Sequence, residues 1–187
     1  MRTKLFIVST ALFLAALPLA ANAADWKPLS DTGQTTCYDV VGTVIHCPPA
    51  GEALHGQDAN YGGRQQVYQD NGNATVTDLN TGLMWQKSDD GTTRSWQDAF
   101  DYCLGIDDGG YDDWRLPEHF ELQSIADYGR VDPAINPVFS CRSSYYWTAT
   151  IYASHTTNAW VVYFYDGNDT AYFMIPSNYV RCVRAGL

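Results

Sequence analysis

Trp114-Arg115-Leu116-Pro117 is the segment that decides the fold of this 187-residue chain. It is followed by Glu118-His119-Phe120-Glu121-Leu122. Proline favours the first position of a helix, because the N–H that it lacks would have no partner there anyway. Gly129 stands where such a helix is expected to end. An apolar stripe is formed by Leu116, Phe120, Leu122 and Ile125. We therefore predict a buried strand end that leads into a short helix, and we interpret most of these residues as architecture.

Residues 1–23 have the three parts of a secretory signal peptide: a basic start, an apolar centre and the small-residue site Ala21-Asn22-Ala23. The apolar run is short for a membrane span and no basic stop follows it, so an anchor is the weaker interpretation. No cysteine directly follows the cleavage site, which disfavours a lipid anchor. We predict cleavage before Ala24 and a secreted, periplasmic or cell-surface location.

The mature chain is expected to be strongly acidic. Removing Arg2 and Lys4 with the signal leaves 9 basic and 21 acidic side chains on 164 residues, a net charge of −12. Such a surface repels nucleic acid and anionic lipid heads, and it disfavours strongly anionic polysaccharides. A chain of this length suits one domain with a real core.

All five cysteines lie in the mature chain, at positions 37, 47, 103, 141 and 182. Export favours disulfides, and the odd count leaves one thiol or one intermolecular bridge. No Cys-x-x-Cys pair occurs and the histidines are scattered, so we expect neither a zinc site nor another cofactor. Residues 37–47 are typical of a hairpin that turns near Gly42 and is clasped by its end cysteines, within a loop-rich appendage over 24–69.

The main domain is expected over residues 70–187. Strands are predicted at 75–78 and 83–86 around a turn at 80–82. The acids and amides near residue 70 suggest a calcium loop, but no glutamate closes it, so a turn is preferred. Ser95 and Asp98 are typical of a helix cap, and the helix is expected to end at Gly105. Further strands are predicted at 145–150, 159–165, 170–174 and 179–184. Helices followed by an antiparallel sheet indicate an α+β fold.

Five ordered motifs resemble a known family. They are Thr81-Gly82-Leu83-Met84-Trp85-Gln86-Lys87, Trp96 with Ala99 and Cys103, Asp113-Trp114-Arg115-Leu116-Pro117 with Glu121-Leu122, Tyr146-Trp147-Thr148, and Val180-Arg181-Cys182-Val183-Arg184. Over about residues 70–187 the chain is similar to the bacterial domain typified by the C-terminal domain of the Legionella collagen-like adhesin (Lcl). That family resembles the C-type-lectin-like fold, which includes the formylglycine-generating enzymes.

This resemblance implies two short helices packed on a twisted antiparallel sheet in a loop-rich fold. It also implies a disulfide between Cys103 and Cys182, which would leave Cys141 unpaired beside a Cys37–Cys47 clasp. The late-loop cysteine pair of the enzyme branch is absent, as are the calcium-binding triplets of the sugar-binding lectins. The sulfated glycosaminoglycans associated with the collagen-like adhesin suit a basic surface, so that ligand does not carry over to this acidic chain.

No catalytic residue is predicted. A Gly-x-Ser-x-Gly motif and a phosphate-binding glycine loop are both absent. The acid pairs 89–90, 107–108 and 112–113 suggest glycoside cleavage, but turns explain them more simply. Arg115 or Arg181 is expected to pair with Glu121, with a substrate clamp as the alternative. The residues interpreted as structural are Trp114, Arg115, Leu116, Pro117, Glu121 and Arg181, and the tryptophans expected in the core are Trp85, Trp96, Trp114 and Trp147.

The resemblance places function in loops above the sheet, which here are residues 152–158 and 166–169. Their amides, hydroxyls and aromatic neighbours suit sugar or peptide recognition, although ordinary hairpin turns explain them equally well. The candidate ligand-binding residues are His155, Trp160, Tyr165 and Asn168. We predict a non-catalytic recognition or adhesion module that binds a glycan or protein at the cell surface, without membrane insertion; a homo-oligomer is compatible with this. The alternatives are an enzyme, either a degenerate formylglycine-generating type or a glycosidase, and a structural subunit of a surface assembly.

Overall fold

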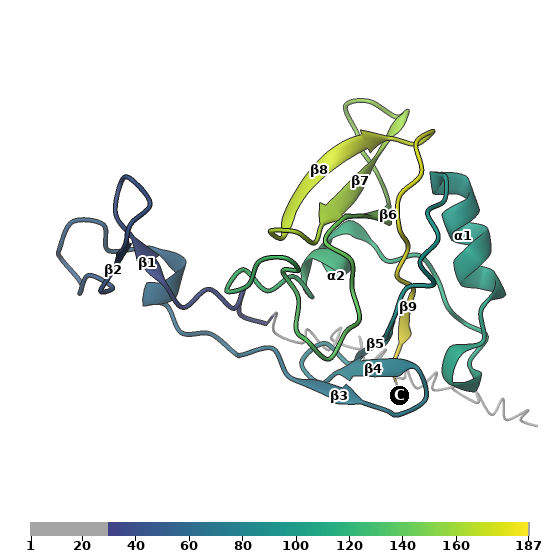
Figure 1. The fold of residues 1–187 in the computed structure, drawn as a ribbon, viewed down its shortest axis with the longest axis horizontal. Coiled ribbons are helices and arrows are strands. Elements are labelled where there is room, and N and C mark those ends of the chain that lie inside the picture. The colour runs from purple at the N-terminus through teal and green to yellow at the C-terminus, as the bar shows by residue number, and fades with distance from the viewer. Residues whose placement is uncertain (1–29, 187) are drawn as a thin grey trace, which may run out of the picture.

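The computed structural model describes residues 30–186, which form two antiparallel sheets, two α-helices and a small N-terminal lobe (Figure 1). The predicted signal peptide and its cleavage site lie outside these residues. No helix within residues 30–186 is long and apolar enough to cross a membrane. The α+β prediction is therefore confirmed.

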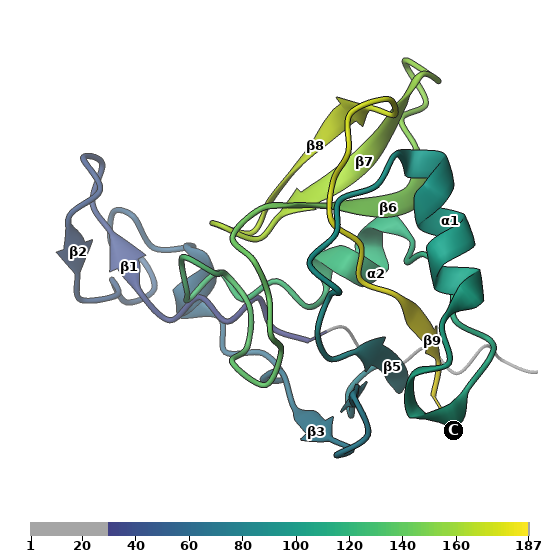
Figure 2. The ribbon, with the colours of Figure 1, turned by 45° about the vertical axis from the view of Figure 1, so that its right-hand side comes forward.

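The N-terminal lobe is built on the hairpin of β1 (Cys37–Tyr38) and β2 (Val44–Ile45), followed by the 3-10 turn η1 (Asp58–Asn60). Gly42 adopts a φ of 84° in the turn, which is a backbone conformation that glycine accepts without strain. A Cys37–Cys47 disulfide closes the hairpin, with the two Cα atoms 5.0 Å apart. The predicted clasp is thus confirmed, and the lobe extends away from the main domain (Figures 1 and 2).

The first sheet has the order β3-β4-β5-β9, formed by β3 (Tyr68–Asp70), β4 (Thr75–Asp78), β5 (Leu83–Gln86) and β9 (Val183–Ala185). The strands β4 and β5 match the prediction, whereas β3 was not expected from the sequence. Trp85 lies opposite Val76 on one side and Val183 on the other. All three side chains are fully buried, so the C-terminal strand is held into the sheet by a central tryptophan.

The second sheet is the meander β6-β7-β8, formed by β6 (Tyr145–Ile151), β7 (Asn158–Tyr163) and β8 (Asn168–Phe173). Helix α1 (Trp96–Gly105) begins after Ser95, whose Oγ accepts a hydrogen bond from the backbone N–H of Asp98, as predicted. The disulfide between Cys103 and Cys182 joins α1 to the segment before β9, with Cα atoms 5.6 Å apart. The pairing implied by the family resemblance is therefore present.

Helix α2 (His119–Gln123) differs from the prediction. Its N-cap is Glu118, so Pro117 precedes the helix and does not occupy its first position. Reciprocal hydrogen bonds between Glu118 and Glu121 close a capping box. The helix ends at Gln123, well before Gly129, and Phe120 is 80% exposed, so its place in the apolar stripe was wrong.

The core has two parts that meet at the second sheet. One face of that sheet packs on α2 and the first sheet, and the other packs on α1 around the Cys103–Cys182 disulfide. Trp85, Trp114 and Trp147 are fully buried, whereas Trp96 is only partly buried and donates its Nε1–H to Thr148 O at 2.8 Å.

Candidate binding surfaces

The four predicted ligand-binding residues separate into two pairs. His155 and Trp160 belong to the β6–β7 end of the second sheet, whereas Tyr165 and Asn168 belong to the β7–β8 turn. Consecutive turns of an antiparallel meander lie at opposite ends of the shared strand, here the six-residue β7, which is roughly 20 Å long. The two pairs therefore lie at opposite ends of the sheet, and ligand binding by these four residues stays a prediction.

Trp160 lies in a row of aromatic side chains beside α2. Its indole stacks on the imidazole of His119 at 4.5 Å between centroids and 6° between planes. Phe120 extends the row beyond His119 at 5.0 Å, and Tyr152 meets Trp160 edge-on at 5.2 Å. His155 stacks on Tyr152 at 5.8 Å and forms the far end. We call these five residues the aromatic row.

The centre of the aromatic row is buried and its ends are open. His119 is 8% exposed, whereas Phe120 is 80% exposed. Nε2 of His119 lies 2.7 Å from Oδ2 of Asp169 on β8, out of line for a hydrogen bond with the ring N–H. Sequence reasoning missed His119 and Phe120 as site residues, because no local pattern connects α2 with β7, about forty residues later in the chain.

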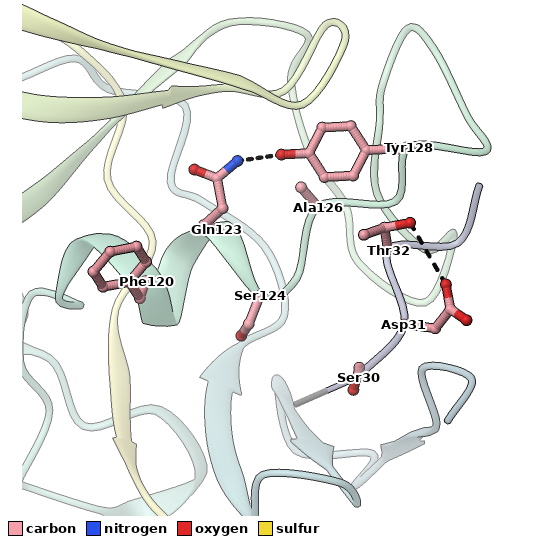
Figure 3. Close-up of a pocket in the computed structure, with 8 residues that line it drawn as sticks. All are labelled: Ser30, Asp31, Thr32, Phe120, Gln123, Ser124, Ala126 and Tyr128. Atoms are coloured by element: carbon pink, nitrogen blue, oxygen red, sulfur yellow. Dashed lines mark hydrogen bonds between the residues drawn. The ribbon is translucent and has the colours of Figure 1, made fainter. Parts of the chain in front are cut away.

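A groove of about 260 Å³ lies between α2 and the start of the N-terminal lobe (Figure 3). Phe120 belongs to both the groove and the aromatic row, so the two are continuous. Tyr128 forms part of the wall, and its hydroxyl is hydrogen-bonded to Nε2 of Gln123. The residues that line the groove are Ser30, Asp31, Thr32, Phe120, Gln123, Ser124, Ala126 and Tyr128.

The N-terminal lobe is tied to the groove by two hydrogen bonds that involve the backbone of Tyr128. The N–H of Tyr128 donates to Thr32 O at 2.8 Å, and Nε2 of Gln34 donates to Tyr128 O at 3.1 Å. A second hollow of about 410 Å³, lined by Thr32, Gln34, Asp58 and Tyr128, shares two residues with the first. Both surfaces form between segments that are almost a hundred residues apart in the chain, so the sequence held no local signal for them.

The other predicted pair lies beside a stack of four tyrosines on the opposite face of the second sheet. Tyr165, Tyr163, Tyr145 and Tyr172 follow one another with centroid separations of 5.7, 4.3 and 5.4 Å. Because the rings lie face to face, most of their faces are already covered by a neighbouring ring. Asn168, at the start of β8, directs its side-chain amide to Asp166 at 2.8 Å. This end therefore offers ring edges and one amide, with less free aromatic area than the aromatic row.

The charged residues of the Trp-Arg-Leu-Pro region have structural partners. Arg115 forms two parallel hydrogen bonds to the carboxylate of Glu121, at 2.7 and 2.6 Å, which confirms one of the two expected pairs. Arg181 is fully buried and instead donates to the carbonyl oxygens of Gln86, Lys87 and Ser140 at 2.5, 2.8 and 2.7 Å.

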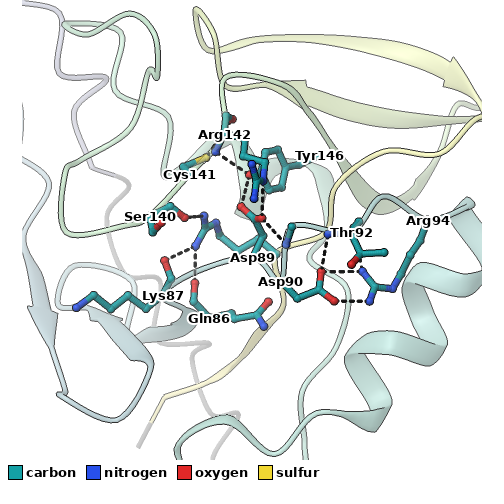
Figure 4. Close-up of polar contacts among 12 residues, drawn as sticks. Gln86, Lys87, Asp89, Asp90, Thr92, Arg94, Ser140, Cys141, Arg142 and Tyr146 are labelled. Atoms are coloured by element: carbon teal, nitrogen blue, oxygen red, sulfur yellow. Dashed lines mark hydrogen bonds and ion pairs between the residues drawn. The ribbon is translucent and has the colours of Figure 1, made fainter.

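A second polar network surrounds Tyr146 (Figure 4). Asp89 accepts from the hydroxyl of Tyr146 at 2.6 Å and from Nε of Arg142 at 3.1 Å. Burial, together with the nearby Cys141 and the bond to Asp89, raises the pKa of Tyr146 far above its ordinary value, so the phenol stays neutral. Cys141 is the free cysteine of the described chain, as the resemblance implied.

A family model for the Lcl C-terminal domain matches residues 74–184, which is more than half of the chain. The chain belongs to the Lcl C-terminal domain family. The predicted resemblance is thus confirmed at the level of the family. None of the curated proteins compared matches the chain.

The Lcl domain contains the aromatic row completely, but only one wall of the groove. The matched range covers α2, Tyr128 and the second sheet, whereas Ser30, Asp31 and Thr32 precede it. The groove is therefore formed jointly by the Lcl domain and the N-terminal segment before it.

The acid pairs considered for glycoside cleavage serve as structural ties within the Lcl domain. Asp90 accepts two hydrogen bonds from the guanidinium of Arg94, and Asp113 accepts two from Arg184. These arginines lower the pKa of both carboxyls. Asp108 accepts from Nε2 of Gln86 at 3.0 Å. At least one member of each pair is thus engaged with another side chain, as expected for turn residues.

Positive charge on the described surface is almost fully compensated. Of the lysines and arginines in residues 30–186, all but Arg64 and the buried Arg181 form an ion pair with a carboxylate. Many acids have no such cationic partner, so the outer surface of the Lcl domain carries a negative potential. Within the same residues, no group of three His, Cys, Asp or Glu side chains is arranged to hold a metal ion.

Proposed function

We propose that the protein is a surface recognition module that binds a carbohydrate or protein partner without catalysing a reaction. Membership of the Lcl C-terminal domain family supports an adhesion-related role. Two disulfides are consistent with an oxidising location outside the cytoplasm. The observation that carries the proposal is the open aromatic row, which continues through the exposed Phe120 into the groove.

The aromatic row has the composition of a recognition surface. Aromatic rings supply contact area, and a few polar groups beside them fix the orientation of a ligand. Phe120 and Trp160 provide the rings here, while Gln123 of α2 provides an amide and Asp169, which contacts His119, provides a carboxylate. An isolated apolar side chain on a surface needs no explanation, but a continuous apolar groove points to a binding site.

The ion pairs of the lysines and arginines favour some classes of ligand over others. A sulfated polysaccharide needs several free lysines or arginines, and the described surface offers only Arg64. We propose a ligand that is neutral or cationic, either a neutral glycan or a protein segment that carries basic residues. Weakening of the complex by salt would indicate the cationic class.

The finer assignment to a C-type-lectin-like fold is part of the proposal. It is supported by two short helices packed on antiparallel sheet and by the Cys103–Cys182 disulfide between the first helix and the C-terminal segment. Superposition of an experimental structure on lectin-like domains tests it. A different strand order around that disulfide would contradict it.

The absence of catalysis is also a proposal. The described chain has one free thiol, Cys141, whereas an oxidase of the formylglycine-generating type acts through a cysteine pair. Thiol mapping by mass spectrometry before and after reduction checks this point. Reduction and reoxidation of a bridge involving Cys141 under mild conditions would favour the enzyme alternative.

Binding is tested with the mature, fully oxidised protein on an array of neutral and sulfated glycans and on a panel of purified surface proteins. For the probe that binds, we expect Phe120→Ala and Trp160→Ala each to weaken affinity at least tenfold, about 1.4 kcal/mol. The melting temperature should stay unchanged in Phe120→Ala, whose side chain is exposed, and should fall in Trp160→Ala, whose indole covers the buried His119. Leu104→Ala removes a similarly exposed side chain from α1 and serves as the control.

The same assay separates the two ends of the second sheet. If Tyr165→Ala and Asn168→Ala weaken binding while Phe120→Ala and Trp160→Ala do not, the site lies at the β7–β8 turn. Binding of sulfated glycans alone would contradict the proposed ligand class, and wild-type affinity in all four variants would contradict both sites.

A further inference from the structure

The outer edge of β8 presents unpaired backbone groups. Within residues 30–186, β8 pairs only with β7, and Figures 1 and 2 show no other described segment along its outer side. The N–H of Met174 donates to Thr157 O at 3.2 Å, so Met174 and Thr157 form a hydrogen-bonded pair. The next opposed pair along the ladder is Phe173 and Asn158. Bonded and non-bonded pairs alternate in an antiparallel ladder. The N–H and C=O groups of Asp169, Ala171 and Phe173 therefore point outward, away from β7.

This edge lacks the features that usually protect an exposed strand. Natural edge strands are blocked by proline, lysine, bulges or short length. β8 is six residues long, contains neither proline nor lysine, and keeps an unbroken register with β7. Its end is apolar and open to solvent, with Phe173 62% exposed and Ile175 87% exposed. Such an edge is a template for another strand.

We propose that β8 pairs antiparallel with β8 of a second copy of this chain and joins the two meanders into one six-stranded sheet. The pairing places the two-fold axis at Tyr172. Ala171 of each copy then lies opposite Phe173 of the other, and their outward N–H and C=O groups form four hydrogen bonds.

The tyrosine stack supports this register. The stack of Tyr165, Tyr163, Tyr145 and Tyr172 ends at β8, where Tyr172 is 37% exposed. With the axis at this residue, the two Tyr172 rings lie in a non-hydrogen-bonded pair, the position where cross-strand side chains are closest. The stack therefore continues from one copy into the other.

Charge favours a second copy over a different, cationic partner at this edge. Asp169 is the only charged residue of β8, and its Oδ2 already lies 2.7 Å from Nε2 of His119. In the proposed register the Asp169 residues of the two copies do not lie opposite each other. The paired part of the edge is therefore neutral and self-complementary. Because strand pairing alone forms a small interface and each chain is strongly acidic, we expect a weak dimer that added salt strengthens.

The first test is sedimentation equilibrium of the mature protein in a Cys141→Ser background, which prevents disulfide exchange through the free thiol. We expect a monomer–dimer equilibrium with a Kd on the order of 10–100 µM. Phe173→Glu adds a like charge at the proposed contact and should raise the Kd at least tenfold. Leu104→Glu adds the same charge at a similarly exposed site on α1 and should leave the Kd unchanged.

A backbone variant and a crosslink test the pairing itself. Ala171→Pro removes an outward N–H while leaving the bonds to β7, so it should abolish dimerisation at an unchanged melting temperature. Tyr172→Cys should form an interchain disulfide under mild oxidation, because opposed residues in such a pair bring their Cα atoms within bridging range; Leu104→Cys should not. If Ala171→Pro does not fold, the dimerisation of Phe173→Glu and the crosslinking of Tyr172→Cys test the proposal instead. A protein that stays monomeric, or a dimer that survives Phe173→Glu, overturns the proposal.

Discussion

Arg181→Met tests how the end of the first sheet is held to the neighbouring loop at Ser140. The guanidinium of Arg181 is fully buried and has no carboxylate partner. Its charge is stabilised by three carbonyl oxygens and by the rings of Phe139 and Tyr146, whose centroids lie 5.2 and 5.8 Å from Cζ. One arginine therefore connects the end of β5, the loop at Ser140 and the segment before β9.

The expected loss of stability follows from these contacts. Methionine preserves most of the apolar stem but removes a donor from three carbonyls. Lys87 O keeps the hydrogen bond from the N–H of Ser140 at 3.0 Å, so the cost of about 1–3 kcal/mol for each buried carbonyl that loses its donor applies to the other two. Two of the three bonds are only partly buried, so water replaces part of the loss. The variant also avoids burying a cation, which returns some free energy. We expect a net loss of about 2–5 kcal/mol, a large fraction of the 5–15 kcal/mol typical of a domain.

Urea unfolding of the oxidised protein, followed by tryptophan fluorescence, measures this loss. Arg64→Met is the matched control, because Arg64 is exposed and the change should stay within about 0.5 kcal/mol. Arg181→Lys should be intermediate, since one ammonium group cannot reach all three carbonyls as the planar fork does. An unfolding free energy of Arg181→Met within about 0.5 kcal/mol of wild type would refute the reasoning.

Three further predictions concern stability. Burial raises the pKa of Glu121, but hydrogen bonds from Arg115 and from the backbone of Glu118 outweigh it and lower the pKa overall. This pair therefore stabilises the fold above the pKa that Glu121 has in the unfolded chain, and the stabilisation is lost as the pH falls through the lower pKa of the folded protein. Arg115→Gln should destabilise the protein by about 1 kcal/mol at pH 7, a modest loss because Arg115 is partly exposed. The variant should also flatten the acid limb of a curve of stability against pH. Replacing Cys103 and Cys182 by serine should lower the free energy of unfolding by up to roughly 4.5 kcal/mol, against roughly 2.7 for Cys37 and Cys47, as measured by denaturation of the two double variants. Ser95→Ala should cost about 1 kcal/mol in thermal unfolding through loss of the α1 cap, whereas an unchanged melting curve would show that the cap bond contributes nothing.

Local signals in the sequence were sufficient for several elements. The Ser95 cap, the turn at 80–82 and the strands around it depend on residues within a few positions of one another. The Arg115–Glu121 pair was also within reach, because both residues flank one helix start. The strand β3 escaped prediction because its three residues are stabilised by pairing with β4 and carry no alternating apolar pattern of their own.

Phe120 shows why the candidate site could not be predicted. The sequence prediction placed Phe120 in a buried stripe with Leu122 and Ile125; these two are fully buried as predicted, but the buried residue at the start of α2 is His119 and not Phe120. His119 was overlooked because a histidine at a helix start gives no apolar signal, and it stacks on Trp160, far along the chain. The exposed phenylalanine and the stacked histidine are thus two consequences of one long-range contact, and this contact also creates the aromatic row.

The two proposed surfaces share β8, and this connection gives a last prediction. Asp169 on β8 contacts His119 in the aromatic row, so a dimer through β8 would hold two such rows in one rigid assembly. Two linked sites bind a surface with many copies of a ligand about 10²–10⁴ times more tightly than one site binds a single copy. Phe173→Glu should therefore weaken attachment to a densely coated surface at least tenfold while leaving the affinity for a monovalent probe unchanged. Surface plasmon resonance in both orientations, with the protein immobilised sparsely and then free in solution, measures the two quantities. Equal losses in the two orientations would place Phe173 in the binding site itself and separate dimerisation from adhesion.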